Sequence, residues 1–579
     1  MQQFSLLTTR APGTRLAAAD FAPGLILTPE RRLGFPLYRS DLLCSRAPKE
    51  DSMTQALAAF HAAVQMVHAS RAFRSRQTFR ATFLVIMITA FLSGLCLGQM
   101  SVTLSPKTGP PTSETHVSGS GFAPNAEIDI YFDSAYQTFV NASSSGSFSK
   151  VSVQVPASAV PGEHWVSAEQ VSTDTGAQAP FKVNTNWSTF GFSPSGGRFN
   201  PYENVLNTTN VGSLQLKWRY YIGNFGEYQL NSSAAVVDGV VYVGSSSPAG
   251  AMYALNATTG KLLWTFPVVG SIGAVLSSPA AVSGKVYFGS IDENVYALGA
   301  AGVLVGLYTT QGEVTSSPAV VDGILYVGSN DGNLYALGSK GLTWDWQYAT
   351  GGPVDSSPAV ANGVVYVGSE YGNNPPAPPA LTAFNADSTG GFLWEDPPCG
   401  SVESSPAVAN GSVVYVGDDE GCVTAFEPNI QTAWQVTPTG SPIQSLAESD
   451  GVIYAGDTNG FLVALNGLSG TQLWGVNPCQ PNCQSFGTEI GYSSPAVANG
   501  VVYVGGGANT GNGFVAAVDA ATGAVLWNFV FDDLVTASPT VVNGMLYIQA
   551  LDGYMYALGL PDPPQPQTRP KLSSLHRRQ

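Results

Sequence analysis

Between Trp187 and Gly559, short apolar runs alternate with turn residues in one repeating pattern. Each repeat follows SSPAVVxGxVYVGS with a turn, an xLYAL run, a second turn and an xLLW run. Short runs that are rich in Val, Tyr and Leu and bounded by Gly, Asn or Asp are typical of β-strands. The pattern therefore predicts four strands per repeat, joined by tight turns into antiparallel sheets.

The first turn of each repeat is predicted to be a two-residue hairpin, because Asn-Gly and Asp-Gly readily adopt the positive φ angles that such a hairpin requires. The turn recurs at Asp238-Gly239, Ser283-Gly284, Asp322-Gly323, Asn362-Gly363, Asn410-Gly411, Asp450-Gly451, Asn499-Gly500 and Asn543-Gly544. A tyrosine follows each turn, at Tyr242, Tyr287, Tyr326, Tyr366, Tyr415, Tyr454, Tyr503 and Tyr547. Successive tyrosines are 39 to 49 residues apart, which is the length of a four-stranded propeller blade. The repeats thus predict eight blades.

The fourth strands support the same count. Six of the repeats end in a tryptophan, and the Leu307-Tyr308 pair takes this place in the second repeat. The eighth repeat runs into PDPPQPQTRP and has no fourth strand, whereas the spare strand LQLKWRYYI, with Trp218, precedes the first repeat. This spare strand is expected to complete the eighth blade and to close the ring, which would leave only short, protected sheet edges.

Before the repeats, residues 101–184 alternate with period two, as in Ile128, Ile130 and Phe132, with turns rich in Gly, Ser and Pro. Short strands at this spacing predict a β-sandwich. The run VTLSPKTGPPTSETHVSGSGFAPNAEIDIYF resembles bacterial immunoglobulin-like modules of the IPT/TIG kind, which implies a spacer or adhesion unit. His116 and His164 are expected to be ordinary surface or strand residues, because neither has a second histidine nearby. The predicted fold class is therefore all-β: an eight-bladed β-propeller over residues 187–560 with an N-terminal Ig-like β-sandwich.

The amino-terminal region has the layout of an export signal. Arg71, Arg74, Arg76 and Arg80 precede an uncharged apolar run over residues 81–98, so residues 66–98 predict a signal peptide or a signal anchor. Residues 1–65 lie far upstream for such a signal and are expected to be a non-native or disordered extension, and residues 561–579 a disordered tail. The body is predicted to be extracytoplasmic, whether secreted, periplasmic or on the cell surface, with membrane contact only through an uncleaved leader.

The net charge and its distribution exclude some classes of binding partner. The net charge is -16, and the sequence has no Lys, Arg or His between Lys340 and Arg569. A surface without cations cannot hold a phosphate backbone, so nucleic acid is excluded as a partner. Acidic residues of this span, such as Asp418, Asp419, Asp532 and Asp533, must face water, accept hydrogen bonds or meet a cation. A solvated acidic surface is favoured, and a Ca²⁺ site is the alternative.

Four cysteines follow the leader, which suits an oxidising compartment. Three pairings are open, and we favour Cys399 with Cys422, within one blade, and Cys479 with Cys483, which would close a small loop. The four cysteines are a weak zinc set, since no histidine lies near them.

One motif connects the repeats with a known family. Residues 517–527 fit the tryptophan-docking motif AxDxxTGxxxW, residues 254–264 fit it with Asn256 in place of Asp, and residues 464–474 are a looser copy. The repeats therefore resemble those of the quinoprotein alcohol dehydrogenase-like superfamily, whose PQQ-like repeats form β-propellers. The resemblance implies that the Asx side chain caps the turn and that the tryptophan packs between neighbouring blades. The tryptophans expected in this role are Trp218, Trp264, Trp346, Trp394, Trp434, Trp474 and Trp527.

The resemblance does not extend to the chemistry. The predicted propeller has no histidine, which excludes Ser-His-Asp and Cys-His triads and histidine metal sites. The adjacent Cys-Cys pair of the quinone-using dehydrogenases is absent from the sequence, as is a Cys-x-x-Cys-His haem motif, and no catalytic, cofactor-binding or metal-binding residue of that family can be assigned. Adjacent carboxylates such as Asp532-Asp533 are expected to point apart, so glycoside hydrolysis lacks a facing pair.

The sequence therefore favours an exported, non-catalytic binding or scaffold propeller that needs no cofactor and contacts a protein or a polysaccharide. A divergent quinoprotein oxidoreductase that uses pyrroloquinoline quinone (PQQ) with Ca²⁺ is the alternative, and an extracellular adhesin is a third hypothesis. The loop edges and the central funnel are the expected contact surfaces.

Overall fold

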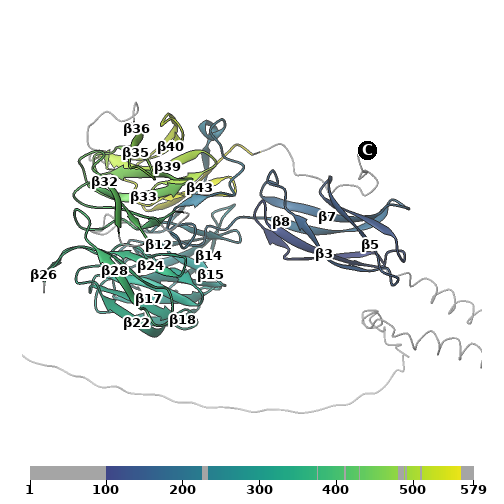
Figure 1. Ribbon diagram of the computed structural model, residues 1–579, viewed down its shortest axis with the longest axis horizontal. Helices are drawn as coiled ribbons and strands as arrows, with labels where there is room; N and C mark the ends of the chain where they lie inside the picture. Colours follow the sequence, from purple (N-terminus) through teal and green to yellow (C-terminus); the bar gives the residue numbers. More distant parts are fainter. Residues whose placement is uncertain are drawn as a thin grey trace, which may run out of the picture. The chain divides into compact units, whose positions relative to one another are not determined.

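The structure is a computed structural model that describes residues 99–223, 232–373, 376–409, 413–428, 431–479, 488–489, 492–508 and 512–562. In this part of the chain the fold is all-β, as predicted: strands joined by turns, with one 3-10 helix, η2 (Val211–Ser213) (Figure 1). The predictions for the leader, for the tail beyond residue 562 and for Cys483 fall outside these residues. None of the helices in the described ranges is long and apolar enough to cross a bilayer.

Two sheets that share one apolar core make up the amino-terminal module. Every second residue of β3 is buried, as an alternating strand requires, whereas in β4 Asp129 and Tyr131 are buried as well as the alternating apolar residues. The immunoglobulin-like identity of the module stays a prediction. The first sheet contains β1 (Ser101–Ser105), β3 (Glu114–Ser120) and β6 (Phe148–Gln154). The second contains β2 (Thr108–Gly109), β8 (Thr175–Val183), β7 (Gly162–Gln170), β4 (Glu127–Phe132) and β5 (Ala135–Asn141).

The repeats fold into antiparallel four-stranded units, which we number S1 to S8 along the chain. S1 contains β11 (Ala235–Val237), β12 (Val240–Ser245), β13 (Ala251–Asn256) and β14 (Leu262–Phe266). S2 contains β15 (Ala280–Val282), β16 (Lys285–Gly289), β17 (Asn294–Gly299) and β18 (Leu304–Thr309). S3 contains β19 (Ala319–Val321), β20 (Ile324–Ser329), β21 (Asn333–Gly338) and β22 (Thr343–Ala349). S4 contains β23 (Ala359–Ala361), β24 (Val364–Gly368), β27 (Leu381–Asn385) and β28 (Phe392–Asp396), with a small hairpin of β25 (Gly372–Asn373) and β26 (Pro376–Ala377).

The remaining units follow the same plan. S5 contains β29 (Ala407–Val408), β30 (Val414–Gly417), β31 (Val423–Glu427) and β32 (Gln431–Val436). S6 contains β33 (Ile443–Ser449), β34 (Val452–Asp457), β35 (Leu462–Asn466) and β36 (Gln472–Val476). S7 contains β38 (Ala496–Ala498), β39 (Val501–Ala508), β40 (Gly513–Asp519) and β41 (Val525–Phe531), and it is extended by β9 (Phe199–Asn200) and β37 (Thr488–Glu489). S8 contains β42 (Thr540–Val542), β43 (Met545–Gln549), β44 (Tyr554–Gly559) and β10 (Gln215–Tyr221).

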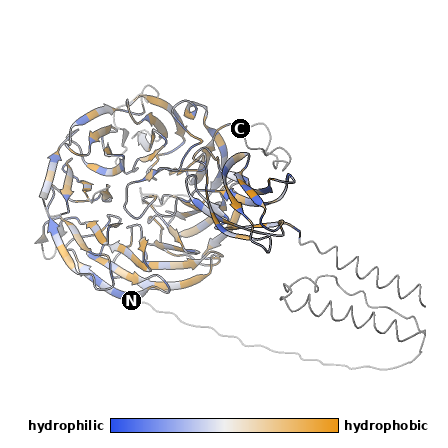
Figure 2. Ribbon diagram, turned by 45° about the vertical axis from the view of Figure 1, so that its right-hand side comes forward, coloured by the Kyte–Doolittle hydropathy of each residue, from blue (hydrophilic) through white to orange (hydrophobic). Residues whose placement is uncertain are grey.

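The first strands of the units surround a common axis. Each neighbours the first strand of the next unit, and β42 of S8 neighbours β11 of S1, so the described units form a closed ring (Figure 2). The last unit is completed by a strand that precedes S1 in the chain, since β10 pairs antiparallel with β44. The predicted role of the Trp218 strand is thereby confirmed.

The hairpin turns between the first and second strands have the predicted backbone geometry. In S4, Asn362 has a φ of 50° and Gly363 a φ of 77°, as a type I′ turn requires. The matching pairs in S1, S2, S3, S6, S7 and S8 also have two positive φ angles. The pair Asn410-Gly411 lies outside the described residues.

Tryptophans of the fourth strands connect neighbouring units. The indole Nε1 of Trp346 in S3 donates a hydrogen bond of 2.8 Å to the carbonyl of Asp387, in the last turn of S4. Its ring lies against Gly390 of that turn, where a Cβ would overlap with the ring. Equivalent indole bonds join S8 to S1, S1 to S2, S5 to S6 and S6 to S7, through Trp218, Trp264, Trp434 and Trp474. Trp394 is buried, and Trp527 packs on Phe529.

The Asx residue of the docking motif caps the turn, as expected. Asp519 Oδ1 accepts hydrogen bonds from the backbone N–H groups of Ala521 and Thr522 and from the Thr522 hydroxyl. Asn256 makes the equivalent bonds in S1, so the amide replaces the carboxylate there without loss of the cap.

Candidate functional site in the axial cavity

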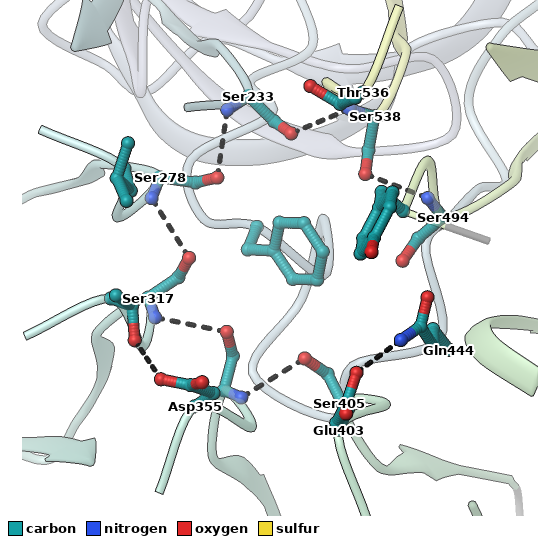
Figure 3. Close-up of a pocket in the computed structure, with 15 residues that line it drawn as sticks. Ser233, Ser278, Ser317, Asp355, Glu403, Ser405, Gln444, Ser494, Thr536 and Ser538 are labelled. Carbon is teal, nitrogen blue, oxygen red and sulfur yellow. Dashed lines mark hydrogen bonds between the residues drawn. The ribbon is translucent and has the colours of Figure 1, made fainter. Parts of the chain in front are cut away.

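A ring of serine hydroxyls lines the axis of the repeat units. The second serine of the Ser-Ser-Pro sequence, which is Ser-Ser-Ala in S1 and Ala-Ser-Pro in S8, donates its backbone N–H to the hydroxyl of the matching serine in the next unit, at 2.9 to 3.1 Å (Figure 3). The series contains Ser233, Ser278, Ser317, Ser357 and Ser405, and then Ser494 and Ser538. It is interrupted at S6, where Gln444-Ser445-Leu446 stands in place of Ser-Ser-Pro.

The first serine of each pair holds its own unit in register. In S4 the Ser356 hydroxyl accepts the N–H of Gly368 and donates to the carbonyl of Ser404 in S5. Gly368 must be glycine for packing reasons, because a Cβ there would overlap with Val402. The buried ends of the first strands therefore have their hydrogen bonds satisfied between units, as buried polar groups require.

Residues 187–200, here called the crossing segment, close one end of the axis. Their carbonyls accept backbone bonds from the first strands of several units, including Ala281 N–H to Ser188, Val360 N–H to Pro194 and Val497 N–H to Arg198. β9, within this segment, pairs in parallel with β38. The segment therefore makes a floor beneath the serine ring.

Arg198 fixes this floor. Its side chain is 1% exposed and donates to the carbonyls of Phe190, Pro495 and Pro539. The guanidinium also lies 4.5 Å from the centre of the Phe190 ring, a favourable cation–π geometry. Burial lowers the pKa of Arg198 to about 9, so the group stays charged at neutral pH. Three of its five N–H donors are bound to these carbonyls, which makes Arg198 a structural cation.

Above the floor lies an open-ended cavity of about 150 Å³. Its walls are the serine hydroxyls, Phe190, and the residues that immediately precede the inner Ser-Ser pairs, among them Leu276, Thr315, Asp355 and Glu403. Gln444, Tyr492 and Thr536 contribute from S6, S7 and S8. None of the described residues that line the cavity is Lys, Arg or His.

Four carboxyl groups gather on the S4 and S5 side of the cavity. Asp355 and Glu403 line it directly, and Glu370 and Asp419 lie close enough to interact electrostatically with them. Burial, repulsion from Asp355 and a hydrogen bond that protonated Glu370 donates to Asp355 raise the pKa of Glu370 to about 8. Burial also raises the pKa of Glu403, although the hydrogen bond from Gln444 partly offsets this effect. The ion pairs found in the described part of the chain include no cavity carboxylate.

Only neutral side chains donate to the two lining carboxylates. The Thr315 hydroxyl donates to Asp355 and the Gln444 amide donates to Glu403 (Figure 3). Across the cavity from them, Thr536 is 8% exposed, and its Oγ1 has no hydrogen-bond partner. Oε1 of Gln444 is likewise buried without a partner. The cavity therefore presents acceptors in excess of donors.

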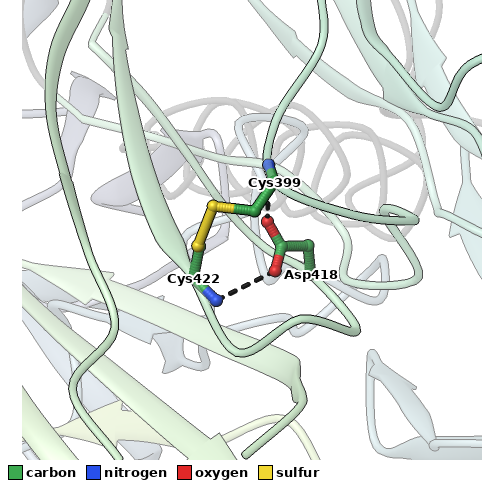
Figure 4. Close-up of side chains that lie close together, drawn as sticks. All are labelled: Cys399, Asp418 and Cys422. Carbon is green, nitrogen blue, oxygen red and sulfur yellow. Dashed lines mark hydrogen bonds between the residues drawn. A yellow bond between two sulfur atoms is a disulfide. The ribbon is translucent and has the colours of Figure 1, made fainter. Parts of the chain in front are cut away.

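The predicted disulfide between Cys399 and Cys422 is confirmed (Figure 4). Asp418 lies beside it, and its carboxylate accepts the backbone N–H groups of Cys399 at 3.1 Å and Cys422 at 2.9 Å. The sulfurs and a carboxylate oxygen lie within 4.8 Å of one another, but disulfide sulfurs are not the thiolates that bind metals. This cluster is structural. The pairing of Cys479 with Cys483 stays a prediction, because Cys483 lies outside the described residues.

The adjacent carboxylates that the sequence suggested do not face one another. Asp418 and Asp419 each accept backbone N–H groups of the Cys399–Ser401 loop, and Asp533 accepts the N–H of Leu534. The facing carboxyls come instead from S4 and S5, which sequence reasoning missed. Aligning the residue before each Ser-Ser pair would have grouped Asp355 with Glu403.

The two histidines of the amino-terminal module are ordinary, as expected. His116 lies on β3, half-exposed beside Glu114. His164 is buried in β7, and its ring nitrogens lie 2.7 Å from Asp133 and from the carbonyl of Val160. The bond with Asp133 raises the pKa of His164.

The cavity does not fit pyrroloquinoline quinone. The quinone carries carboxylates, which need cationic partners or free hydrogen-bond donors, whereas the lining side chains are acids, hydroxyls, apolar groups and the Gln444 amide, which already donates to Glu403. Arg198 is 1% exposed and donates to three backbone carbonyls. Asp355 and Glu403 are acids, and like charges repel, so the lining disfavours an anionic quinone.

Fold and repeats together define a protein built from PQQ-like β-propeller repeats. The family model described as outer membrane protein assembly factor BamB matches residues 294–388, 346–482 and 459–560. The model described as the β-propeller domain of glucose, ethanol and alcohol dehydrogenases matches residues 187–274.

Two kinds of curated relative share these repeats. The outer membrane protein assembly factor BamB of Yersinia pestis is 34% identical over 161 residues, which are 26% of this chain and 39% of the relative. The dehydrogenase subunit of the quinone alcohol dehydrogenase of Gluconobacter oxydans is 37% identical over 124 residues, which are 20% of this chain and 16% of the relative. The chain thus spans well under half the length of either protein.

Solved structures share the fold at low sequence identity. The quinohemoprotein alcohol dehydrogenase of Comamonas testosteroni has a TM-score of 0.53 at 16% identity, over 66% of this chain and 82% of that one. The enzyme ADHIIG of Pseudomonas putida HK5 has a TM-score of 0.54 at 16% identity, over the same shares. Identity this low shows the fold alone.

Proposed function

We propose that this chain is an exported, non-catalytic scaffold whose eight-bladed propeller binds a protein partner at the mouth of the axial cavity. In this proposal the amino-terminal module is an Ig-like spacer, and the chain works outside the cytoplasm. The disulfide Cys399–Cys422 supports this location, since such bonds persist in oxidising compartments. The relative named as an outer membrane protein assembly factor supports a protein as the partner.

The observation that carries the proposal is the chemistry of the axial cavity. Asp355, Glu403 and the serine ring offer hydrogen-bond acceptors to a guest, and the floor is closed by the chain itself. Such a cavity is suited to binding a donor group and ill suited to an anionic quinone. The divergent quinoprotein oxidoreductase is therefore the weaker hypothesis.

Glycoside hydrolysis also lacks support. Glu370 and Asp355 are hydrogen-bonded to each other, whereas retaining glycosidases hold their two carboxyl groups about 5 Å apart and inverting enzymes hold them farther apart. A sugar cannot enter between two groups that are hydrogen-bonded to each other. The pair is better explained as part of an acidic lining.

Two measurements on the purified full chain test the proposal. The first is capture of proteins from a cell-envelope extract with identification by mass spectrometry, for which we expect a specific protein that free chain displaces. The second is incubation with pyrroloquinoline quinone and Ca²⁺, for which we expect no dye-linked oxidation of alcohols or sugars. Alcohol oxidation, or a quinone redox spectrum that follows the protein, would contradict the scaffold function and establish the quinoprotein alternative.

A further inference from the structure

The axial cavity has an uncompensated charge on one side only. Asp355 of S4 and Glu403 of S5 line adjacent sectors, and Asp419 lies near enough to add to the same negative potential. The other lining residues are neutral. The carboxylates on this side of the cavity can pair with the positive charge of a guest, so the guest would not need an anion of its own to neutralise it.

The hydrogen-bond inventory specifies the kind of cation. The lining holds carboxylate, hydroxyl and amide oxygens, including the unpartnered Thr536 Oγ1 and Gln444 Oε1. The acceptors are distributed around the axis, with the carboxylates on one side and Thr536 on the opposite side (Figure 3). A guanidinium has five N–H donors spread over a plane and no acceptor, so it matches a ring of acceptors better than an ammonium or a hard metal ion does.

The chain already binds one guanidinium next to this cavity. Arg198 is held by backbone carbonyls of S7 and S8 and packs on the rings of Trp187 and Phe190, and Phe190 also lines the cavity floor. The same ring is available to a guest from the cavity side. The face of an aromatic ring attracts a guanidinium group, in addition to packing against apolar groups.

From these observations we infer that the axial cavity is a binding site for an arginine side chain, which a partner polypeptide inserts along the axis toward Phe190. The carboxylates of Asp355 and Glu403 receive the charge, and the hydroxyls of Thr536 and the serine ring accept the remaining N–H groups. This inference rests on the proposed function, because it specifies how the partner is recognised.

The test uses the full chain and a fluorescein-labelled peptide of alternating glycine and arginine residues, measured by fluorescence anisotropy at constant ionic strength. The decisive variant is the double substitution Asp355→Asn/Glu403→Gln, which keeps side-chain size and removes two charges. We expect its affinity for the peptide to fall by about tenfold or more, since charge-assisted hydrogen bonds are lost. A peptide with citrulline in place of arginine should bind the wild type as weakly as the arginine peptide binds the variant.

The matched control is Asp238→Asn/Asp322→Asn. These exposed residues sit in hairpin turns at the opposite end of the first strands, where other repeats carry Asn, so the net charge changes equally away from the cavity. We expect less than about a twofold loss of affinity. Equal weakening in both double variants would mean non-specific attraction and would overturn the inference.

A second variant guards against misfolding of the first. Thr536→Val removes the unpartnered hydroxyl and keeps the side-chain shape, and we expect a ~3-fold weaker affinity with unchanged thermal unfolding. Agmatine separates a small-molecule source of the guanidinium from a polypeptide, and binding at least as tight as that of the peptide would overturn the polypeptide assignment. Displacement of the peptide by micromolar Ca²⁺ would overturn it as well, because the carboxylates would then be a metal site.

The two proposals can fail separately. If the full chain captures a specific envelope protein and Asp355→Asn/Glu403→Gln captures it equally well, the scaffold function stands and the arginine site is wrong. If alcohol oxidation with the quinone is found, the scaffold function itself is wrong.

Discussion

At the scale of single residues, the acidic side of the cavity stores unfavourable electrostatic energy. Glu370 is half-buried, and it faces Asp355, Glu403 and Asp419 with no described cation in contact. Residues in such positions retain a proton at neutral pH because the charged form is disfavoured by burial and by repulsion. Energy of this kind is typical of sites that are prepared for a partner of opposite charge rather than for stability.

This arrangement gives stability a specific pH dependence. The pKa of Glu370 is about 8 in the folded chain and about 4.3 in an unfolded one. Between these values the folded state binds more protons than the unfolded state, so the free energy of unfolding falls as pH rises through this window. We expect Glu370→Gln to abolish this contribution, and its melting temperature at pH 9 should exceed that of the wild type by roughly 2 °C or more.

The control is Glu420→Gln, at an exposed position in S5. Thermal unfolding of the three proteins between pH 5 and 9 should show the wild type and the control declining together, with Glu370→Gln diverging upward above about pH 6. Parallel curves for all three proteins would show that Glu370 has no raised pKa.

At the scale of the element, neighbouring units are joined where a tryptophan ring packs against a glycine of the next unit, as Trp346 of S3 packs against Gly390 of S4. Gly390 has a φ of 58°, so alanine at this position is strained, and its Cβ would also overlap with the Trp346 ring. Strain in the left-handed region costs about 1–2 kcal/mol, and overpacking typically adds 1–3 kcal/mol. We expect Gly390→Ala to lower the free energy of unfolding by roughly 2–5 kcal/mol in urea denaturation.

The chain offers a matched control in the same unit. Gly363 has a φ of 77°, and a Cβ there would meet nothing within 4 Å. Gly363→Ala should therefore cost only the backbone strain, about 1–2 kcal/mol. Similar losses in the two variants would show that the contact between the indole and Gly390 contributes little to the joining of S3 and S4.

How far the sequence predicts this fold depends on how local the determining interactions are. The hairpins, the Asx caps and the disulfide follow from residues close in the chain, such as Asn362-Gly363 and Asp519, and these predictions are confirmed. The crossing segment was not predicted, because it is held through backbone bonds to strands far along the chain, which leave no side-chain periodicity. Arg198 and the acidic side of the cavity were missed for the same reason. Asp355 and Glu403 meet only once consecutive units are placed around the axis.

At the scale of the whole molecule, the ring is closed by a strand pairing between distant parts of the chain. β10 has β44 as its sheet neighbour in S8, and Trp218 of β10 donates 2.9 Å to the carbonyl of Ala257 in S1. The pairing therefore connects the last unit to the first through both backbone and side chain. Contacts of this sequence separation form slowly, since they require closure of a long loop.

Two truncations test the role of this closure. A chain that stops after Gln549 lacks β44, so β10 loses its partner and two sheet edges become exposed. We expect its melting temperature to fall by roughly 10 °C or more, and protease to cleave first near residues 215–221. A chain that stops after Asp562 keeps β44 and should melt within about 2 °C of the full chain. Equal melting temperatures for both truncations would show that the pairing does not hold the ring together.

The closure by β10 also sets an order of events for the newly made chain. Since β10 is synthesised before S1 and β44 after S7, the ring cannot be sealed until β44 has emerged. A truncated chain that lacks even one strand of the ring keeps unpaired sheet edges, which proteases and chaperones recognise. The architecture thus makes closure of the ring depend on synthesis of every unit from S1 to S8.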